Sequence, residues 1–570
     1  MRADDRFRRW LTDTSLSMQE RRRLYRLADN KEAFLGAFGE PLTLQNGRLI
    51  GKLGDGPAHI NDRTVRWVAA AIASHLTDRG IDKGLVILGG EVRLQTDDFI
   101  EVIADQLAVY DHHVAIWQDP IPAGVLSWAI RYARADAGLY IGADAAGAEM
   151  NGVICYSAQG APVHGQEADR LAKRYQTYLN GRDPKPVTDL SASDRADRRQ
   201  LVEPQMGDLY LADLLYGEGL LKDHKADDTP LSILYTALHG SGGNFIPDAL
   251  NELGFQDFRE VDAQAQPDGS FPDMVRPNPS DPQALEEASR LGYVMGTDLI
   301  LASDPPARRI GCAVRHKGDF VLLTPEQITA LLIDQLPKLL PQPTYGVIAA
   351  PLNASPFAKR VALSRGFQVR EATDGMAAIG QTARETVHDG GKLFLAYDDG
   401  AISGGNLNRE GDAVFTAAAL ALAAQRLKAF GRTLVDQLNL LYGAFGYWTD
   451  RHFYMDPAGA LPADLTARTL KNLVDMPPQD IFGRKIKVLI DYTHGSFWLQ
   501  PAPLLQYCFA DGSQVTVYAD TAARRLTCQI HCLSPNHDTA RQAAETLAGR
   551  LRKALKVAAE TAKASRSDKA

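Results

Sequence analysis

A short turn that combines one acid with two arginines follows an apolar run near the middle of the chain. The run DLIL leads into LASDPPARRIG, which holds Asp304 and Arg309. In α/β proteins the loops at the carboxyl ends of parallel strands face the ligand crevice, where the chemistry is usually placed. This turn is therefore a candidate active-site loop, or the remains of one.

The sequence contains none of the residue patterns that mark common hydrolases, zinc enzymes or nucleotide-binding proteins. The residues offer no evident Ser-His-Asp, Cys-His or metal arrangement. The 5 cysteines are far apart and form no CxxC pair, so neither a zinc site nor a disulfide framework is expected. The GSGG after His239 lacks the lysine of a phosphate-binding P-loop. An unrelated enzyme such as a hydrolase therefore finds no support.

Length and composition indicate a soluble protein of several domains. The chain has 570 residues, 45% hydrophobic and 23% charged, which is ordinary composition but too long for one core. A net charge of −8 argues against a nucleic acid or an anionic membrane as partner. The N-terminus has no apolar leader, and the Ala-rich AVFTAAALALAAQRL is expected to be a buried helix. We expect a cytoplasmic location.

Three stretches of the chain alternate short apolar strands with helical segments. This alternation predicts βαβ crossovers, mostly parallel sheets and an internal repeat of one α/β unit. The expected strands are GLVILGGEVR, HHVAIWQD and AGLYIGAD in the first unit, LSILYTALHGSGG, DFREVDAQ and DLILASD in the second, and YGVIAAPL, FQVREA and KLFLAYDDG in the third.

The last hundred residues or so have a different pattern. Apolar and polar residues alternate at period two around Gly512, which predicts antiparallel strands. A terminal helix is expected from Ser534, with Pro535 in its first turn. Stretches rich in Pro, Asp and Gly or Ser suggest the boundaries of four domains, at 1–205, 206–322, 323–455 and 456–570.

Several longer motifs match one family over nearly the whole chain. They are ARADAGLYIGADAAGAEMNGVICYSAQGAPV, YTALHGSGGNFIPDALNELGF, FPDMVRPNPSDPQALEEA and LLYGAFGYW. With the order of three α/β units and one antiparallel α+β unit, the chain resembles the α-D-phosphohexomutase family in its phosphoglucomutase/phosphopentomutase branch. The resemblance implies four domains around a central cleft. It also implies transfer of phosphate between the 1- and 6-hydroxyls of a sugar through a phosphoserine, with Mg²⁺ and a sugar bisphosphate activator.

The loops that carry this chemistry in the family are altered here. The serine of T-A-S-H-N-P falls at Asp144, in GADAAG. The metal loop D-P-D-A-D-R reads DPPARR, which keeps Asp304 and Arg309 but has Pro306 and Arg308 in place of the other two acids. One carboxylate is a poor Mg²⁺ site, because this ion requires near-octahedral oxygen coordination. The first two loops thus lack the nucleophile and most of the metal ligands.

The remaining family loops are altered as well. The sugar loop E-E-x-x-G-Y reads DDGAISG, so Asp398 and Asp399 keep the charge with shorter side chains. The basic residue of R-D-K-D-G falls at Gly411 in REGDA. The phosphate cradle R-P-S-G-T-E-P reads YADTAAR from Tyr518, and Ile50 replaces the arginine of the N-terminal G-T-A-G-L-R-G loop. The general base and the second phosphate site are therefore missing too.

A few positions of the family pattern survive, and each admits two interpretations. By resemblance Arg93, His239, Arg309, Asp398 and Asp399 are candidate substrate-binding residues. Equally, the histidine could brace its turn and the two arginines could pair with acids between domains.

Asp304 is the lone remaining metal-ligand position, and it could instead cap the next helix. No bound metal is expected at this single acid.

The combined losses predict a catalytically inactive member of the family that acts by binding. Its role would be sugar-phosphate sensing, regulation or scaffolding, with a sugar phosphate in the interdomain cleft and a protein as a further partner. Mg²⁺ and a sugar bisphosphate are expected only if the family activity is retained. The alternative is an active phosphoglucomutase-type or phosphopentomutase-type isomerase with a rebuilt site, in which Asp144 is an aspartyl nucleophile.

The altered serine and metal loops suggest compensating charges. An acid stands in the phosphoserine slot and a base in one metal-ligand slot, so a carboxylate replaces the phosphate and a guanidinium the cation. We therefore expect Asp144 to pair with Arg308 or Arg309 between the first two domains.

Overall fold

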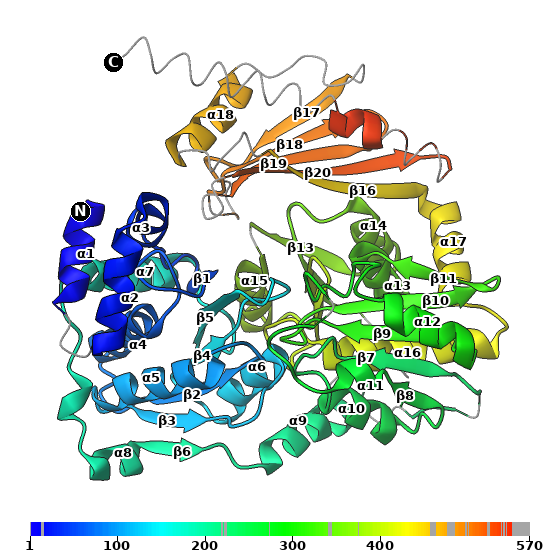
Figure 1. The fold of residues 1–570 in the computed structure, drawn as a ribbon. Helices are drawn as coiled ribbons and strands as arrows, with labels where there is room; N and C mark the ends of the chain where they lie inside the picture. The colour runs from blue at the N-terminus through cyan, green and yellow to red at the C-terminus, as the bar shows by residue number, and fades with distance from the viewer. Residues whose placement is uncertain are drawn as a thin grey trace. The chain divides into compact units, whose positions relative to one another are not determined.

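The chain divides into two compact units, one of residues 1–349 with 376–434 and the other of residues 350–375 with 435–570. The structure, a computed structural model, describes residues 2–12, 16–217, 221, 225–227, 229–272, 274–339, 345–373, 375–455, 463–475, 485–495, 499, 501–520, 525–536, 539, 542 and 544–549. Figure 1 shows the succession of helices and strands in chain order.

The first sheet has six strands in the order β1-β5-β4-β2-β3-β6, in which β4, β2, β3 and β6 are parallel, and β5 is antiparallel to both of its neighbours, β4 and β1. Its strands are β1 (Arg48–Lys52), β2 (Leu85–Gly90), β3 (His113–Ile116), β4 (Ala137–Ile141), β5 (Met150–Ser157) and β6 (Arg199–Leu201). The helices of this region are α1 (Ala3–Leu11), α2 (Met18–Ala28), α3 (Lys31–Phe38), α4 (Asp62–Asp78), α5 (Thr96–Ala108), α6 (Ala123–Tyr132), α7 (Gly165–Leu179) and α8 (Ala192–Arg198), with a 3-10 turn at Val187–Asp189.

The second sheet has the order β11-β10-β9-β7-β8, in which β9, β7 and β8 are parallel, and β10 is antiparallel to both of its neighbours, β9 and β11. Its elements are α9 (Gln205–Tyr216), β7 (Ile233–Thr236), α10 (Phe245–Leu253), β8 (Phe258–Glu260), α11 (Asp262–Ala265), α12 (Glu286–Met295), β9 (Leu299–Ser303), β10 (Ile310–His316) and β11 (Asp319–Leu323). The predicted closure of α10 at Gly254 is confirmed, because this glycine caps the helix in the left-handed conformation with a φ of 92°.

The third sheet has the order β13-β12-β14-β15, with β12 parallel and β15 antiparallel to β14. The elements are α13 (Pro325–Leu339), β12 (Val347–Pro351), α14 (Pro356–Ser364), β13 (Gln368–Ala372), α15 (Gly375–His388), β14 (Leu393–Asp398), β15 (Ala401–Gly404), α16 (Ala413–Ala429) and α17 (Leu434–Phe445). The Ala-rich segment forms α16, whose N-terminus is capped by Asp412 and whose side chains are almost all buried against α10, α13 and β15.

Within the described part of the chain, no single helix is long and apolar enough to cross a bilayer, and only α16 and α17 taken together, with an 86° bend between them, reach the required length and composition.

The fourth sheet is antiparallel throughout, in the order β16-β20-β19-β18-β17. Its elements are β16 (Tyr447–Met455), α18 (Ala463–Asp475), β17 (Ile486–Asp491), β18 (Leu504–Phe509), β19 (Gln514–Asp520) and β20 (Arg525–Ser534). β16 precedes the boundary predicted at residue 456 but pairs with β20. The predicted start of the terminal helix was wrong, since Ser534 still belongs to β20 and Asn536 caps the following turn by accepting a bond from the Thr539 N–H at 2.9 Å. Side-chain capping of this kind fixes where a helix can start.

The predicted fold class is confirmed: three α/β sheets precede an antiparallel α+β region. The first three sheets are mixed rather than wholly parallel, because in each one a parallel strand is followed directly along the chain by an antiparallel neighbour. Those strand pairs are β4–β5, β9–β10 and β14–β15. The serine loop with Asp144, the metal loop with Asp304 and the sugar loop with Asp399 are the connections within these pairs, so they occupy equivalent places in a repeated plan.

Candidate functional site

The three equivalent loops share an unusual backbone feature. Each holds a residue other than glycine in the left-handed region, with φ values of 54° at Asp144, 45° at Ala307 and 43° at Asp399. Such conformations are sparsely populated and persist where the surrounding contacts hold them, often at functional sites. The contacts that hold these loops also join them to one another.

Asp144 and Arg308 form an ion pair between the first two loops. Arg308 donates from Nη1 to Oδ1 of Asp144, and Arg48 of β1 donates from Nη2 to Oδ2 of the same carboxylate. The predicted pairing of Asp144 with Arg308 or Arg309 is thus confirmed. Both oxygens of the acid in the serine slot are engaged by guanidinium groups.

Arg308 also reaches the loop that precedes α16. Its Nη2 and Nε atoms lie 2.9 Å and 3.0 Å from Oε1 of Glu410, a side chain with no solvent exposure. Tyr156 of β5 donates its hydroxyl to Oε2 of Glu410 at 2.8 Å. Arg308, itself only 3% exposed, therefore joins carboxylates from two sequence-distant loops. Arg48, Tyr156 and Glu410 were not predicted from the sequence, in which the stretch REGDA indicated only that the family's basic residue is missing.

The charges in this cluster oppose and compensate one another. Burial acts to raise the pKa of Asp144, but the guanidinium groups of Arg308, Arg48 and Arg309 outweigh it and hold that pKa well below its usual range. Burial acts to lower the pKa of Arg308, and the carboxylates of Asp144 and Glu410 raise it well above its usual value instead. Both members of the pair are therefore fully ionised at neutral pH.

Asp304 and Arg309 shape the second loop. The buried Asp304 accepts the backbone N–H groups of Arg308 and Arg309 at 2.7 Å and 2.9 Å on Oδ1, and its Oδ2 lies 3.4 Å from Nη1 of Arg309. Arg309 donates from Nε to the carbonyl oxygen of Asp399 at 3.0 Å. The serine, metal and sugar loops therefore meet, and Asp304, Arg309 and Asp399 are brought together.

Arg93 fixes the loop of Asp144 through hydrogen bonds to its backbone. The guanidinium has no solvent exposure, and its Nε donates to Glu91 at 2.7 Å. Its Nη1 and Nη2 atoms donate to four carbonyl oxygens of the loop, those of Gly147, Met150, Asp144 and Ala146, at 2.9, 3.0, 2.5 and 3.1 Å. All five N–H donors of this guanidinium are thereby used within the protein.

His239 lies in a turn that packs on the second loop. Its φ is 61°, and its Nδ1 lies 3.1 Å from the carbonyl oxygen of Gln266. Beside it, Ser241 donates its backbone N–H and its hydroxyl to the carbonyl oxygen of Pro305, at 2.8 Å and 2.7 Å. A side chain at Gly240 would lie 2.5 Å from Cα of Pro305, so the close approach of turn and loop requires glycine.

The sugar loop follows β14, whereas the predicted phosphate cradle is described only in part. Asp398 ends β14, opposite Ala401 in the antiparallel register with β15. Tyr518 lies in β19 opposite Leu504, but residues 521–524 of the predicted phosphate cradle lie outside the described residues.

The chain is similar in sequence to known phosphoglucomutases and phosphomannomutases. Residues 47–182 match the family model of phosphoglucomutase/phosphomannomutase alpha/beta/alpha domain I, and residues 210–318 match that of domain II. The phosphoglucomutase of Staphylococcus aureus (strain N315) is 26% identical over 460 residues, 80% of this chain and 81% of the relative. The chain belongs to the α-D-phosphohexomutase superfamily.

Solved phosphohexomutase structures share the fold. A phosphoglucomutase/phosphomannomutase family protein from Burkholderia thailandensis superposes with a TM-score of 0.67 at 16% identity, over 90% of this chain and 97% of that one. The open form of the phosphoglucomutase parafusin from Paramecium gives a TM-score of 0.64 at 16% identity, over 90% and 94% of the two chains.

The residues in the superfamily's metal loop do not fit Mg²⁺. Of the three slots that hold acids in the resemblance, Asp304 already accepts two backbone N–H groups, Pro306 offers no side-chain oxygen and Arg308 brings a positive charge. Within the described ranges, no group of three or more His, Cys, Asp or Glu side chains is placed to hold a metal ion. The arginine that would repel the cation instead contacts the acid in the serine slot.

The slot of the superfamily's basic residue is closed to any side chain. A Cβ at Gly411 would lie 2.7 Å from Cβ of Ala401 and 2.7 Å from the carbonyl oxygen of Arg308. We expect Gly411→Lys to lower the free energy of unfolding by about 1–3 kcal/mol, because the backbone must move to admit it. Urea denaturation would measure this, with Gly36→Lys as control, since nothing lies within 4 Å of a Cβ at Gly36. A Gly411→Lys protein as stable as the wild type would show that the base can be accommodated.

Proposed function

We propose that this phosphohexomutase-family chain is catalytically silent and acts by binding a sugar phosphate, in a sensing, regulatory or scaffolding role. The observation that carries the proposal is the Asp144–Arg308 ion pair, which joins the serine slot directly to a metal-ligand slot. Phosphoryl transfer through a phosphoserine needs a hydroxyl nucleophile and a cation that neutralises the phosphate. Here the nucleophile slot holds a carboxylate and the cation is a guanidinium fixed to the protein.

The changes in the serine, metal and base slots all act against phosphoryl transfer. Loss of a nucleophile or of one key electrostatic group lowers rates by about 10²- to 10⁶-fold, and groups of one catalytic unit do not act additively. Restoring a serine alone would leave the single acid, the arginine and the closed base slot in place. An aspartyl nucleophile at Asp144 is also disfavoured, because Arg48 and Arg308 occupy both of its oxygens.

The test is a phosphotransfer assay on the purified full chain. Incubated with radiolabelled glucose 1,6-bisphosphate and Mg²⁺, the wild type is expected to give no phosphoprotein and no conversion of glucose 1-phosphate above a blank without protein. Asp144→Ser is expected to give none either. Turnover above the blank that disappears in Asp144→Asn would establish the active, rebuilt site and refute the proposal.

Binding is measured separately by calorimetry. Glucose 1-phosphate and glucose 6-phosphate are titrated into the protein with EDTA and again with Mg²⁺. We expect binding of at least one of them with the same affinity in both buffers, because the cation is replaced by Arg308. Absence of any sugar-phosphate binding, or binding that requires Mg²⁺, would contradict the proposal.

A further inference from the structure

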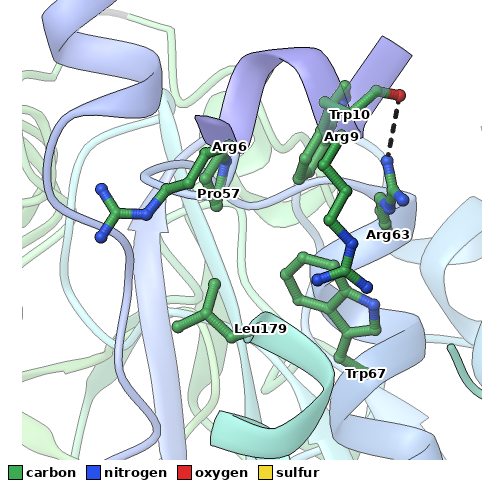
Figure 2. Close-up of a pocket in the computed structure, with 7 residues that line it drawn as sticks. All are labelled: Arg6, Arg9, Trp10, Pro57, Arg63, Trp67 and Leu179. Atoms are coloured by element: carbon green, nitrogen blue, oxygen red, sulfur yellow. Dashed lines mark hydrogen bonds between the residues drawn. The ribbon is translucent and has the colours of Figure 1, made fainter. Parts of the chain in front are cut away.

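A cavity beneath the N-terminal helix carries a concentration of arginine and tryptophan side chains. It is lined by Arg6, Arg9, Trp10, Pro57, Arg63, Trp67 and Leu179 (Figure 2). Helix α1 supplies the first three of these residues, and it precedes the segment that matches the phosphohexomutase domain I model. The cavity is therefore built partly from a portion of the chain outside that match.

The floor of the cavity is aromatic. The indole rings of Trp10 and Trp67 meet edge to face, with centroids 5.8 Å apart and an interplanar angle of 83°. The Arg63 guanidinium lies 4.6 Å above the Trp10 ring and donates to the Trp10 carbonyl oxygen at 3.2 Å. Stacking of this kind orients a guanidinium over an aromatic ring.

Trp67 supplies an unused donor. Trp67 is 5% exposed, and among the described residues nothing accepts a hydrogen bond from its indole N–H, which keeps contact with solvent. Figure 2 shows the Arg9 guanidinium pointing into the cavity toward this nitrogen. The acid that the structure places on Arg9 is Asp183, at 3.4 Å and with 82% of its side chain exposed, so this ion pair is weak and solvent-screened.

Arg6 adds to the positive field without facing inward. It donates from Nη1 to the carbonyl oxygens of Phe38 and Gly39 at the end of α3, and its stem lines the cavity. The guanidinium groups of Arg9 and Arg63 and the indole N–H of Trp67 thus line the cavity. Arginine donors beside an indole N–H suit a compact oxyanion.

We propose that this cavity binds a phosphate group, held by Arg9 and the Trp67 indole N–H within the field of Arg6 and Arg63. The group is either inorganic phosphate or the phosphate of a phosphomonoester whose remainder projects to solvent. The site is distinct from the Asp144–Arg308 cluster and does not depend on whether the chain has mutase activity.

The test is calorimetric titration of the full chain with inorganic phosphate, glucose 6-phosphate and glucose in separate experiments. We expect saturable binding of at least one phosphate ligand and none of glucose. Arg9→Gln and Trp67→Phe should each weaken it by about tenfold or more, as loss of a hydrogen bond to a charged group does. Arg8→Gln is the matched control, because Arg8 is the exposed neighbour on α1, and its binding should stay within about twofold of wild type.

An NMR measurement on the wild type tests the proposal even if the variants fold poorly. The indole N–H resonance that disappears in Trp67→Phe should shift when phosphate is added to the wild type. Stronger binding of inorganic phosphate than of glucose 6-phosphate would identify free phosphate as the source, and the reverse a phosphomonoester. Absence of saturable binding, an unchanged affinity in Arg9→Gln and Trp67→Phe, or an equal loss in Arg8→Gln would overturn the proposal.

Discussion

Arg308→Met should lower the free energy of unfolding by about 3–5 kcal/mol, the cost of removing one partner from a buried ion pair. The substitution keeps most of the side-chain volume but removes the charge that Asp144 and Glu410 share. Glu410 has no solvent exposure, so its carboxylate cannot be rescued by water. The loss should appear in urea denaturation followed by the fluorescence of the 6 tryptophans.

Two further variants test whether the lost stability comes from leaving the buried Glu410 carboxylate without its positive partner. Glu410→Gln should destabilise the wild type, because it weakens the bonds to Arg308, but should stabilise Arg308→Met, because it removes an unpaired buried carboxylate. The control is Arg290→Met: Arg290 is 62% exposed and pairs with Glu287 on the surface, so its loss should cost under about 1 kcal/mol. If Arg308→Met cost no more than this control, the cluster would not stabilise the junction of the loops.

The sequence predicted the Asp144–Arg308 contact because both changes fall in slots of one recognisable pattern. The strands before these loops were also predictable, since buried parallel strands read as continuous apolar runs such as DLIL and AGLYIG. The antiparallel strands β10 and β15 were not separated from the preceding loops, because each strand is short and begins only a few residues after its neighbour ends.

The third partner of the cluster could not be predicted. Glu410 lies 102 residues from Arg308, and REGDA has no periodicity that would distinguish an inward carboxylate from a solvated one. Arg93 was a candidate for substrate contact, but its donors all face the loop of Asp144, and only the closed backbone provides those four carbonyl oxygens. Such contacts depend on loop conformations at positive φ, which local sequence does not specify for residues such as Ala307.

Glu91 should make the stability of the first unit depend on pH near neutrality. This carboxylate is fully buried behind the Asp144 loop, where Oε1 accepts from Nε of Arg93 at 2.7 Å and from the Ala143 N–H at 2.5 Å. Its Oε2 is buried and has no hydrogen-bond donor within the described part of the chain. Burial raises the pKa of Glu91 from 4.5 to about 7, although the Arg93 guanidinium opposes the shift.

A raised carboxyl pKa means that the folded state binds the proton more tightly than the unfolded state. Stability attributable to Glu91 should therefore be fully present below about pH 4.5 and fall as the pH rises toward 7, by about 3 kcal/mol at 1.36 kcal/mol per pKa unit. Asp144 cannot produce this slope, because its pKa is lowered and its contribution is lost only as the pH falls below its ordinary value of 3.8.

The measurement is the difference in unfolding free energy between the wild type and Glu91→Gln across pH 5 to 8. Glutamine keeps one acceptor for Arg93 and Ala143 and cannot ionise, so histidine and surface titrations cancel in the difference. We expect the wild type to lose stability relative to Glu91→Gln as the pH rises. A difference that is flat or that rises over this range would mean that Glu91 is ionised throughout. The buried Arg93 pair would then outweigh the cost of burying the charge.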